Sequence, residues 1–229
     1  MYIEVRNLTK RIRKATVLDH IDLHLKSGRI YGLRGKNGSG KTMLMRALCG
    51  LIVPSEGTVD LNGEILGKDL SFPRSVGVLI ENPSFLGGYT GFDNLKLLAS
   101  IQRRVGDEAI RAVLETVGLD PQDKRKYRKY SLGMKQRLGI AAAVMERPAL
   151  VLLDEPINAL DEKGMELVRG ILRDLKEEGA LILVACHDKE ELDALSDEIY
   201  TLENGRIVDH CIVEPAGQPA EKGGDRDVE

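Results

Sequence analysis

The chain has 229 residues, of which 42% are hydrophobic, and this length suffices for one large α/β domain with an inserted or appended lobe. Its net charge of −3 does not indicate a general affinity for nucleic acid, and its three widely spaced cysteines without CxxC pairing argue against disulfides and a zinc site. No apolar run approaches the roughly 20 residues that cross a bilayer, and the first residues lack a signal-peptide layout, so we expect a cytoplasmic protein.

The N-terminal part of the chain predicts a β layer. Apolar and polar residues alternate over 2–8 and 17–25, apart from Leu18, as they do in half-buried antiparallel strands. A further strand is predicted over 57–61, and the Asn-Gly pair that follows it is a strong hairpin signal. We expect these strands to lie together in one layer.

A glycine-rich segment separates a strand predicted over 29–33 from a helix predicted over 43–49. It reads Gly-Lys-Asn-Gly-Ser-Gly-Lys-Thr and fits the phosphate-binding loop pattern of Gly, four residues, Gly, Lys, and Ser or Thr. In the order strand, loop, helix, the loop N–H groups and the positive helix N-terminus face a polyphosphate. The predicted nucleotide-binding residues are Gly35, Lys36, Asn37, Gly38, Ser39, Gly40, Lys41 and Thr42.

Two residues of this loop have separate predicted roles. Lys41 is expected on the β- and γ-phosphates, and the hydroxyl of Thr42 on Mg²⁺. The alternative is a flexible glycine-rich turn, for which a chance match to the pattern is expected about once in a hundred chains of this length. The strand and helix on either side favour the nucleotide site.

The middle of the chain changes to helical patterns. After a short strand predicted over 75–80, helices are expected over 93–103 and 107–117, and a third begins near Ser131 and stops before Pro148. Residues 84–147 are therefore predicted to form a separate helical lobe.

The last third of the chain returns to buried strands. Unbroken apolar runs over 149–153 and 180–185 are typical of strands covered on both faces of a parallel sheet, and a helix is predicted between them over 161–178. A closing hairpin is expected over 199–209, and the Pro-, Gly- and charge-rich segment 214–229 is predicted to be a disordered tail.

Acidic residues follow the first of these buried strands. Open parallel sheets bind ligands at the carboxyl ends of their strands, so Asp154 is predicted to bind Mg²⁺, directly or through water, and Glu155 to orient and polarise the water that attacks the γ-phosphate. A solvated strand end is an equally good explanation of the two acids by themselves. The phosphate loop upstream favours chemistry.

From residue 2 to about 213 the chain resembles the nucleotide-binding subunit of an ABC transporter. The discriminating segment is 130–137, Tyr-Ser-Leu-Gly-Met-Lys-Gln-Arg, which is similar to the family signature LSGGQ. Ser131 is a good N-cap and Gly133 permits close backbone approach, so the helix that follows presents N–H groups to an anion. The resemblance implies that this anion is the γ-phosphate held by a second ATPase subunit, contacted by Ser131, Gly133 and Met134. Taken by itself, the segment fits a plain N-capped amphipathic helix.

Two further segments carry the resemblance. Residues 157–161 resemble the family's D-loop, which passes between subunits, and His187 resembles the switch histidine that contacts the γ-phosphate. A lone histidine at a strand end is usually a satisfied polar cap, so its role depends on the family position. The resemblance implies Lys41, Glu155 and His187 as catalytic residues.

The chain also departs from the family. Glu81 stands where glutamine is usual; it can still bind Mg²⁺ or the lytic water, but an ionised carboxylate donates no hydrogen bond. Ile12 occupies the position of an adenine-stacking aromatic residue, and together with Val17 it is expected to contact the base. Segments 81–85 and 90–95 resemble the branch of peptide-antibiotic immunity exporters that includes the bacitracin type.

The fold that the resemblance implies is an α/β P-loop NTPase with a mostly parallel sheet core, an antiparallel β layer and an inserted helical lobe. One ATPase domain would span 1–213, with its core at 1–83 and 148–213 and its lobe at 84–147. The implied function is ATP hydrolysis with Mg²⁺ in a head-to-tail dimer that powers a separate membrane permease from the cytoplasmic face, with export of an antimicrobial peptide or drug as the expected transport.

Two other classes of protein share these motifs. An ABC ATPase that acts on ribosomes or DNA usually has two cassettes in one chain or a long coiled coil, and a nucleotide-dependent regulator tends to lose the hydrolytic glutamate.

The basic, tyrosine-containing segment 124–130 suggests RNA, but in an acidic chain a solvated helix end is favoured. We expect no nucleic-acid partner.

Overall fold

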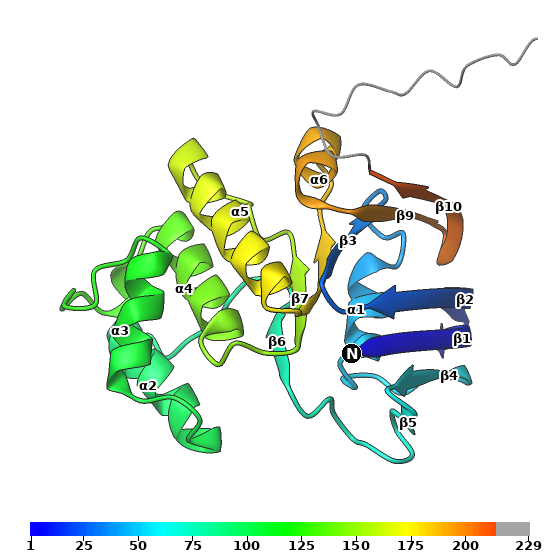
Figure 1. The fold of residues 1–229 in the computed structure, drawn as a ribbon, viewed down its shortest axis with the longest axis horizontal. Coiled ribbons are helices and arrows are strands. Elements are labelled where there is room, and N and C mark those ends of the chain that lie inside the picture. The colour runs from blue at the N-terminus through cyan, green and yellow to red at the C-terminus, as the bar shows by residue number, and fades with distance from the viewer. Residues whose placement is uncertain (214–229) are drawn as a thin grey trace, which may run out of the picture.

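The computed structural model describes residues 1–213, and the predicted tail at 214–229 lies outside this range. The strands form two sheets, one on either side of helix α1 (Figure 1). The four-stranded sheet has the order β2-β1-β4-β5 and consists of β1 (Tyr2–Ile12), β2 (Ala15–Lys26), β4 (Glu56–Leu61) and β5 (Glu64–Ile65). The six-stranded sheet has the order β10-β9-β3-β8-β7-β6 and consists of β3 (Arg29–Arg34), β6 (Val76–Leu79), β7 (Leu150–Asp154), β8 (Leu181–Ala185), β9 (Glu198–Glu203) and β10 (Arg206–Ile212).

The four-stranded sheet is the predicted antiparallel layer. The predicted break in alternation at Leu18 has a local cause, because His20 has a φ of 52° and the pairing of β1 with β2 shifts register nearby. Such a bulge changes the face on which the next side chain lies, so Leu18 and Ile21 both reach the core. The hairpin predicted at Asn62-Gly63 joins β4 to β5.

The central strands of the six-stranded sheet are parallel and buried on both faces. Along β7, Leu150 and Leu152 belong to the core around α1, whereas Val151 and Leu153 belong to the core under the outer helices. Because successive strand residues point to opposite faces, a strand between two apolar layers needs an unbroken apolar run. The predicted α/β architecture is confirmed.

Helix α1 (Lys41–Leu48) packs between the two sheets, and α4 (Leu132–Val144) and α5 (Glu162–Glu177) cover the opposite face of the six-stranded sheet (Figure 1). Helices α2 (Gly91–Gln102) and α3 (Asp107–Thr116) pack against α4 on its far side. Helix α2 begins two residues before its predicted start, because Thr90 and Asp93 form a capping box around its first turn. None of the helices within 1–213 is long and apolar enough to span a bilayer.

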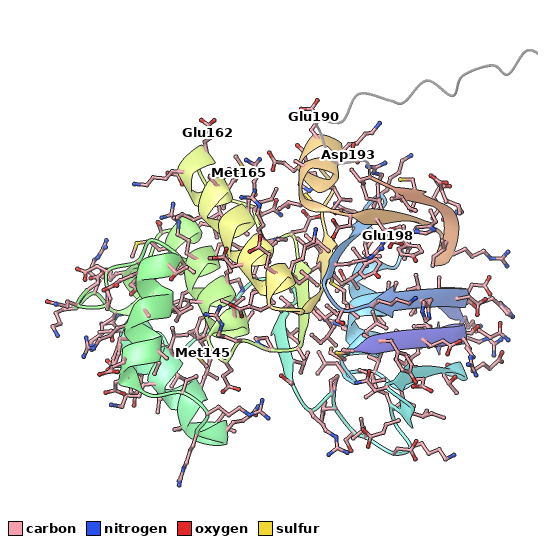
Figure 2. The ribbon with its side chains drawn as sticks, viewed as in Figure 1. Met145, Glu162, Met165, Glu190, Asp193 and Glu198 are labelled. Carbon is pink, nitrogen blue, oxygen red and sulfur yellow. The ribbon has the colours of Figure 1, made fainter. Side chains whose placement is uncertain are left out.

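Helix α6 (Lys189–Leu195) was not predicted. Asp188 caps it by accepting a hydrogen bond from the Glu191 N–H, and acidic residues in the first turn favour the positive helix end. Helix α5 is capped in the same way by Asp161. In both helices an acidic side chain of the first turn, Glu162 or Glu190, points away from the body of the protein (Figure 2).

Candidate nucleotide-binding site

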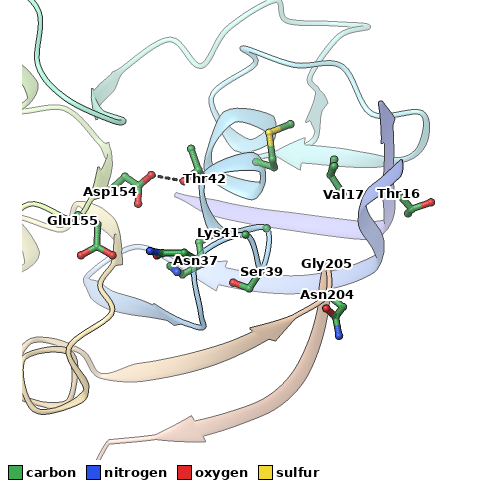
Figure 3. Close-up of a pocket in the computed structure, with 13 residues that line it drawn as sticks. Thr16, Val17, Asn37, Ser39, Lys41, Thr42, Asp154, Glu155, Asn204 and Gly205 are labelled. Atoms are coloured by element: carbon green, nitrogen blue, oxygen red, sulfur yellow. Dashed lines mark hydrogen bonds between the residues drawn. The ribbon is translucent and has the colours of Figure 1, made fainter. Parts of the chain in front are cut away.

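The glycine-rich loop runs from the end of β3 to the start of α1. Gly40, the last residue before the helix, has a φ of 111°, and a Cβ built there would lie 3.0 Å from the Val17 carbonyl oxygen. Both the backbone conformation and the lack of space therefore require glycine at this position. The turn brings Lys41 and Thr42 into the first turn of α1, with their side chains beside the loop (Figure 3).

Polar donors gather inside this loop. The Lys41 ammonium is buried and donates to the carbonyl oxygens of Gly35 at 2.6 Å and Lys36 at 3.3 Å. The Ser39 hydroxyl oxygen is buried as well, and it has no hydrogen-bond partner within the described part of the chain. A buried cation and an unsatisfied hydroxyl next to a helix N-terminus suit an anionic ligand.

A cavity of about 620 Å³ opens over the loop, within the usual size range of small-molecule sites (Figure 3). Gly35 and Lys36 do not line it, and their carbonyl oxygens hold Lys41 instead. Four of its lining residues were not predicted: Thr16, Met43, Asn204 and Gly205. The predicted residues that line it are Val17, Asn37, Gly38, Ser39, Gly40, Lys41, Thr42, Asp154 and Glu155.

The turn between β9 and β10 supports the loop from a distant part of the sequence. The Gly205 N–H donates to the Ser39 carbonyl oxygen at 2.9 Å, and the Gly205 carbonyl oxygen accepts from the Asp19 N–H at 2.8 Å. The only sequence signal was the turn type of Asn204-Gly205, which indicates a hairpin but not its neighbours.

Thr42 and Asp154 meet at the carboxyl end of β7. The Thr42 hydroxyl donates to the Asp154 carboxylate with 2.5 Å between the oxygens (Figure 3). Burial raises the pKa of Asp154 above its ordinary value, and the bond from Thr42 opposes that rise. A hydroxyl and a carboxylate are the oxygen donors that Mg²⁺ prefers, and a bound cation would offset the cost of burying this charge. The residues present therefore fit a magnesium ion.

Glu155 lies beside His187, and a carboxylate oxygen of Glu155 is 2.8 Å from Nδ1 of the imidazole. The main chain of Glu155 has a φ of 50°, the left-handed conformation that residues with a Cβ seldom adopt. Cys186 stands next to this pair, with its sulfur within 4.8 Å of both side chains. Burial raises the pKa of the Cys186 thiol to about 11, so it is protonated at neutral pH and is not a nucleophile.

Other predicted residues lie apart from Thr42 and Asp154. The Glu81 carboxylate pairs with the Arg46 guanidinium at 2.6 Å, although its charge is close enough to raise the pKa of Asp154. Ile12 is 43% exposed at the end of β1 and does not line the cavity.

The signature-like segment also lies outside the cavity lining. Ser131 caps α4, and its hydroxyl oxygen accepts from the Met134 N–H at 3.2 Å. A Cβ built at Gly133 would lie 2.9 Å from the Ala159 carbonyl oxygen, which is tighter than ordinary packing allows. Glycine is thus required here by a contact with the 157–161 segment of the same chain.

Comparisons with known proteins agree with these features. The family model for the ABC transporter domain matches residues 18–158. The ABC transporter ATP-binding protein YybJ of Bacillus subtilis (strain 168) is 51% identical to this chain, covering 90% of it and 94% of YybJ. The bacitracin transport ATP-binding protein BcrA of Enterococcus faecalis is 41% identical, covering 90% and 68% of the two chains. The lantibiotic transport ATP-binding protein SrtF of Streptococcus pyogenes is 36% identical, covering 90% and 89%.

Solved structures share the fold. An ATP-binding subunit of an ABC transporter superimposes with a TM-score of 0.84 at 25% identity, covering 93% of this chain and 90% of the other. A dimeric ATP-binding cassette in a post-hydrolysis state, bound to ADP and Pi, superimposes with the same score at 22% identity, covering 93% and 99%.

Proposed function

Since the chain belongs to the ABC transporter family and is an ATP-binding, ATP-hydrolysing subunit of a transporter, we propose that it hydrolyses ATP with Mg²⁺ in a two-chain assembly and drives a separate membrane permease. The observation that carries this proposal is the cavity in which Lys41, Thr42, Asp154 and Glu155 converge. We propose further that residues 1–213 are one ATPase domain with a helical lobe at 84–147, and that it works on the cytoplasmic face of the membrane.

Each of these side chains suits one part of phosphoryl transfer. Lys41 and the loop N–H groups would bind the β- and γ-phosphates, and Thr42 and Asp154 would hold Mg²⁺, which neutralises negative charge on the phosphate oxygens when bound. Glu155 would accept a hydrogen bond from the attacking water with one carboxylate oxygen, while His187 occupies the other. His187 would thereby fix the orientation of the carboxylate.

The transported molecule is proposed from the relatives. Proteins that are 41% and 36% identical to this chain are described as bacitracin and lantibiotic transport proteins. We propose that the transporter exports a peptide antibiotic or a similar drug, and this agreement favours transport over an action on ribosomes, DNA or gene regulation.

A site shared between two chains is supported by the exposed first turn of α4. Ser131 and Leu132 are exposed, and the turn lies outside the cavity of its own chain. Free N–H groups at an exposed helix N-terminus are suited to an anion held by another molecule. A cassette of the same fold was solved as a dimer.

Mixing two inactive variants tests this arrangement. Lys41→Ala and Ser131→Arg should each abolish hydrolysis, because every site in either homodimer lacks one partner. A 1:1 mixture should recover about a quarter of the wild-type rate, since half of the dimers are mixed and each has one intact site of two. The measurement is phosphate release before and after mixing. No recovery, or normal activity of either variant by itself, would contradict the shared site.

The permease contact is proposed at the segment that precedes α2. Leu86 is 55% exposed, and the buried Asn94 bonds to both its N–H and its carbonyl oxygen, at 2.9 and 3.2 Å. Asn94 thus fixes the Leu86 backbone and leaves the apolar side chain in solvent. Tyr89 is exposed beside it. Exposed apolar groups on a fixed backbone suit a protein partner.

Leu86→Asp should therefore weaken co-purification with the permease by about tenfold or more, the effect of losing roughly 1.4 kcal/mol of binding. ATP binding should stay unchanged, because Leu86 does not line the cavity. Val208→Asp is the matched control, since Val208 on β10 has the same 55% exposure. Equal recovery of the permease with both variants would refute the contact.

A further inference from the structure

A buried side chain of α4 is bonded to the main chain of the proposed catalytic residue. Gln136 is 7% exposed, and its Nε2 donates to the carbonyl oxygens of Glu155 and Pro156, both at 3.0 Å. Carbonyl oxygens only accept hydrogen bonds, so the NH₂ group of the amide must face them. Both of its hydrogens are used on two consecutive peptide groups.

These bonds act where the backbone is strained. Glu155 has a φ of 50°, and a left-handed conformation at a residue with a Cβ persists only where its surroundings hold it. On one side the Glu155 N–H donates to the Ala185 carbonyl oxygen at 2.8 Å, and on the other the Glu155 carbonyl oxygen accepts from Gln136. The two bonds hold the peptide groups before and after the Glu155 Cα, which set the direction of its side chain.

Helix α4 also contacts the 157–161 segment that follows Glu155 and Pro156. Arg137 donates to the Asp161 carboxylate at 2.6 Å, and Gly133 packs against the Ala159 carbonyl oxygen. Gln136 differs from these two because its bond reaches Glu155 itself. A displacement of α4 would therefore move the Glu155 main chain through Gln136. Glu81, at the position where the family usually has glutamine, pairs with Arg46.

We propose that Gln136 is a positioning residue for ATP hydrolysis, which acts by holding Glu155 in its left-handed conformation and makes the direction of the catalytic carboxylate depend on the position of α4. The inference rests on the proposed role of Glu155. Gln136 contributes to the rate of the chemical step and not to nucleotide binding, because it does not line the cavity.

Gln136→Met tests this directly, since methionine has a similar length and no hydrogen to donate. With the chain assembled on its permease, kcat should fall about 10- to 100-fold, as small misplacements of catalytic groups cause, while KM and ATP affinity stay within about twofold. Gln102→Met, the same change at an exposed position at the end of α2, is the matched control and should leave kcat unchanged. A kcat within twofold of wild type, or a KM that rises in parallel, would overturn the proposal.

A double variant shows whether Gln136 acts through Glu155. In a Glu155→Gln background, Gln136→Met should cause no further loss of the residual activity, because effects of two groups that act as one unit are not additive. An additional loss of similar size would mean that Gln136 acts independently, which contradicts the proposal. Gln136→Asn keeps the amide on a shorter side chain and should lose less activity than Gln136→Met. This variant also tests the proposal if Gln136→Met does not fold. A loss of activity equal to that of Gln136→Met would contradict the positioning role of Gln136.

The two levels of the hypothesis fail differently. If Glu155→Gln hydrolyses ATP normally, the proposed role of Glu155 is wrong. If Glu155→Gln is inactive but Gln136→Met is fully active, only the positioning role of Gln136 is wrong.

Discussion

Glu155→Gln should reduce ATP hydrolysis by about 10²-fold or more and leave ATP binding intact. The amide has nearly the shape of the carboxylate, so the left-handed backbone and the surrounding packing are retained, but it cannot accept a proton from the attacking water at neutral pH. ATP should therefore stay bound and hold the two chains together. Single-turnover phosphate release measures the chemical step, and size-exclusion chromatography with ATP measures the trapped dimer.

Glu190→Gln is the matched control for this variant, because it makes the same substitution in the first turn of α6, where the side chain points away from the body of the protein. It should hydrolyse ATP at the wild-type rate. Near-normal hydrolysis by Glu155→Gln would assign the activation of water to another group.

Asp154→Asn should have opposite effects on activity and stability. ATP hydrolysis should fall by about 10²-fold or more, because the proposed Mg²⁺ site loses its carboxylate. The nucleotide-free protein should melt at a higher temperature than wild type at neutral pH, since burial disfavours the charged form of Asp154 and asparagine carries no charge. An amide oxygen can still accept the bond from Thr42.

The pH dependence of this difference follows from the raised pKa. A carboxyl group whose folded pKa lies above its unfolded value stabilises the fold fully below the unfolded value, and this contribution is lost as pH rises through the folded pKa. At neutral pH the wild type has lost this stabilising contribution of Asp154. The melting temperature of Asp154→Asn should therefore exceed that of the wild type most at neutral pH, and the difference should shrink toward acid pH.

Melting curves of both proteins from neutral to acid pH, with EDTA present, measure this difference in stability. For a chain of this size, about 1 kcal/mol corresponds to a shift in melting temperature of about 2–4 °C. A lower melting temperature of Asp154→Asn at neutral pH would show that the charge is compensated within the fold.

Most of the candidate site residues that a local sequence pattern identifies line one cavity in the structure. The strand, loop and helix around Lys41 and Thr42 follow from spacing over a dozen residues, and Asp154 and Glu155 follow from the end of an apolar run. The contacts between side chains could not be predicted from the sequence. The ion pair of Glu81 with Arg46 and the hydrogen bond from Gln136 to Glu155 each join segments that are distant in sequence, and a local pattern does not report such contacts.

Short or edge elements were also missed. Helix α6 has only seven residues, too few for a clear apolar period, so only its cap at Asp188 gave a signal. Cysteine is usually a buried residue, but Cys211 is exposed, because β10 is the edge strand of its sheet. Burial depends on a strand's place in the sheet, and periodicity does not give that place.

The position of β3 has a consequence for the synthesis of this protein. The strand that leads into the phosphate loop pairs with β8 on one side and β9 on the other, and these are made about 150 and about 170 residues later. A nascent chain therefore carries the complete loop sequence long before any partner strand exists for it, and Gly205 comes later still. Even a piece cut to the family match at 18–158 would lack both neighbours of β3. Nucleotide binding should thus begin only after β8, β9 and Gly205 have been synthesised, and not when the loop itself emerges.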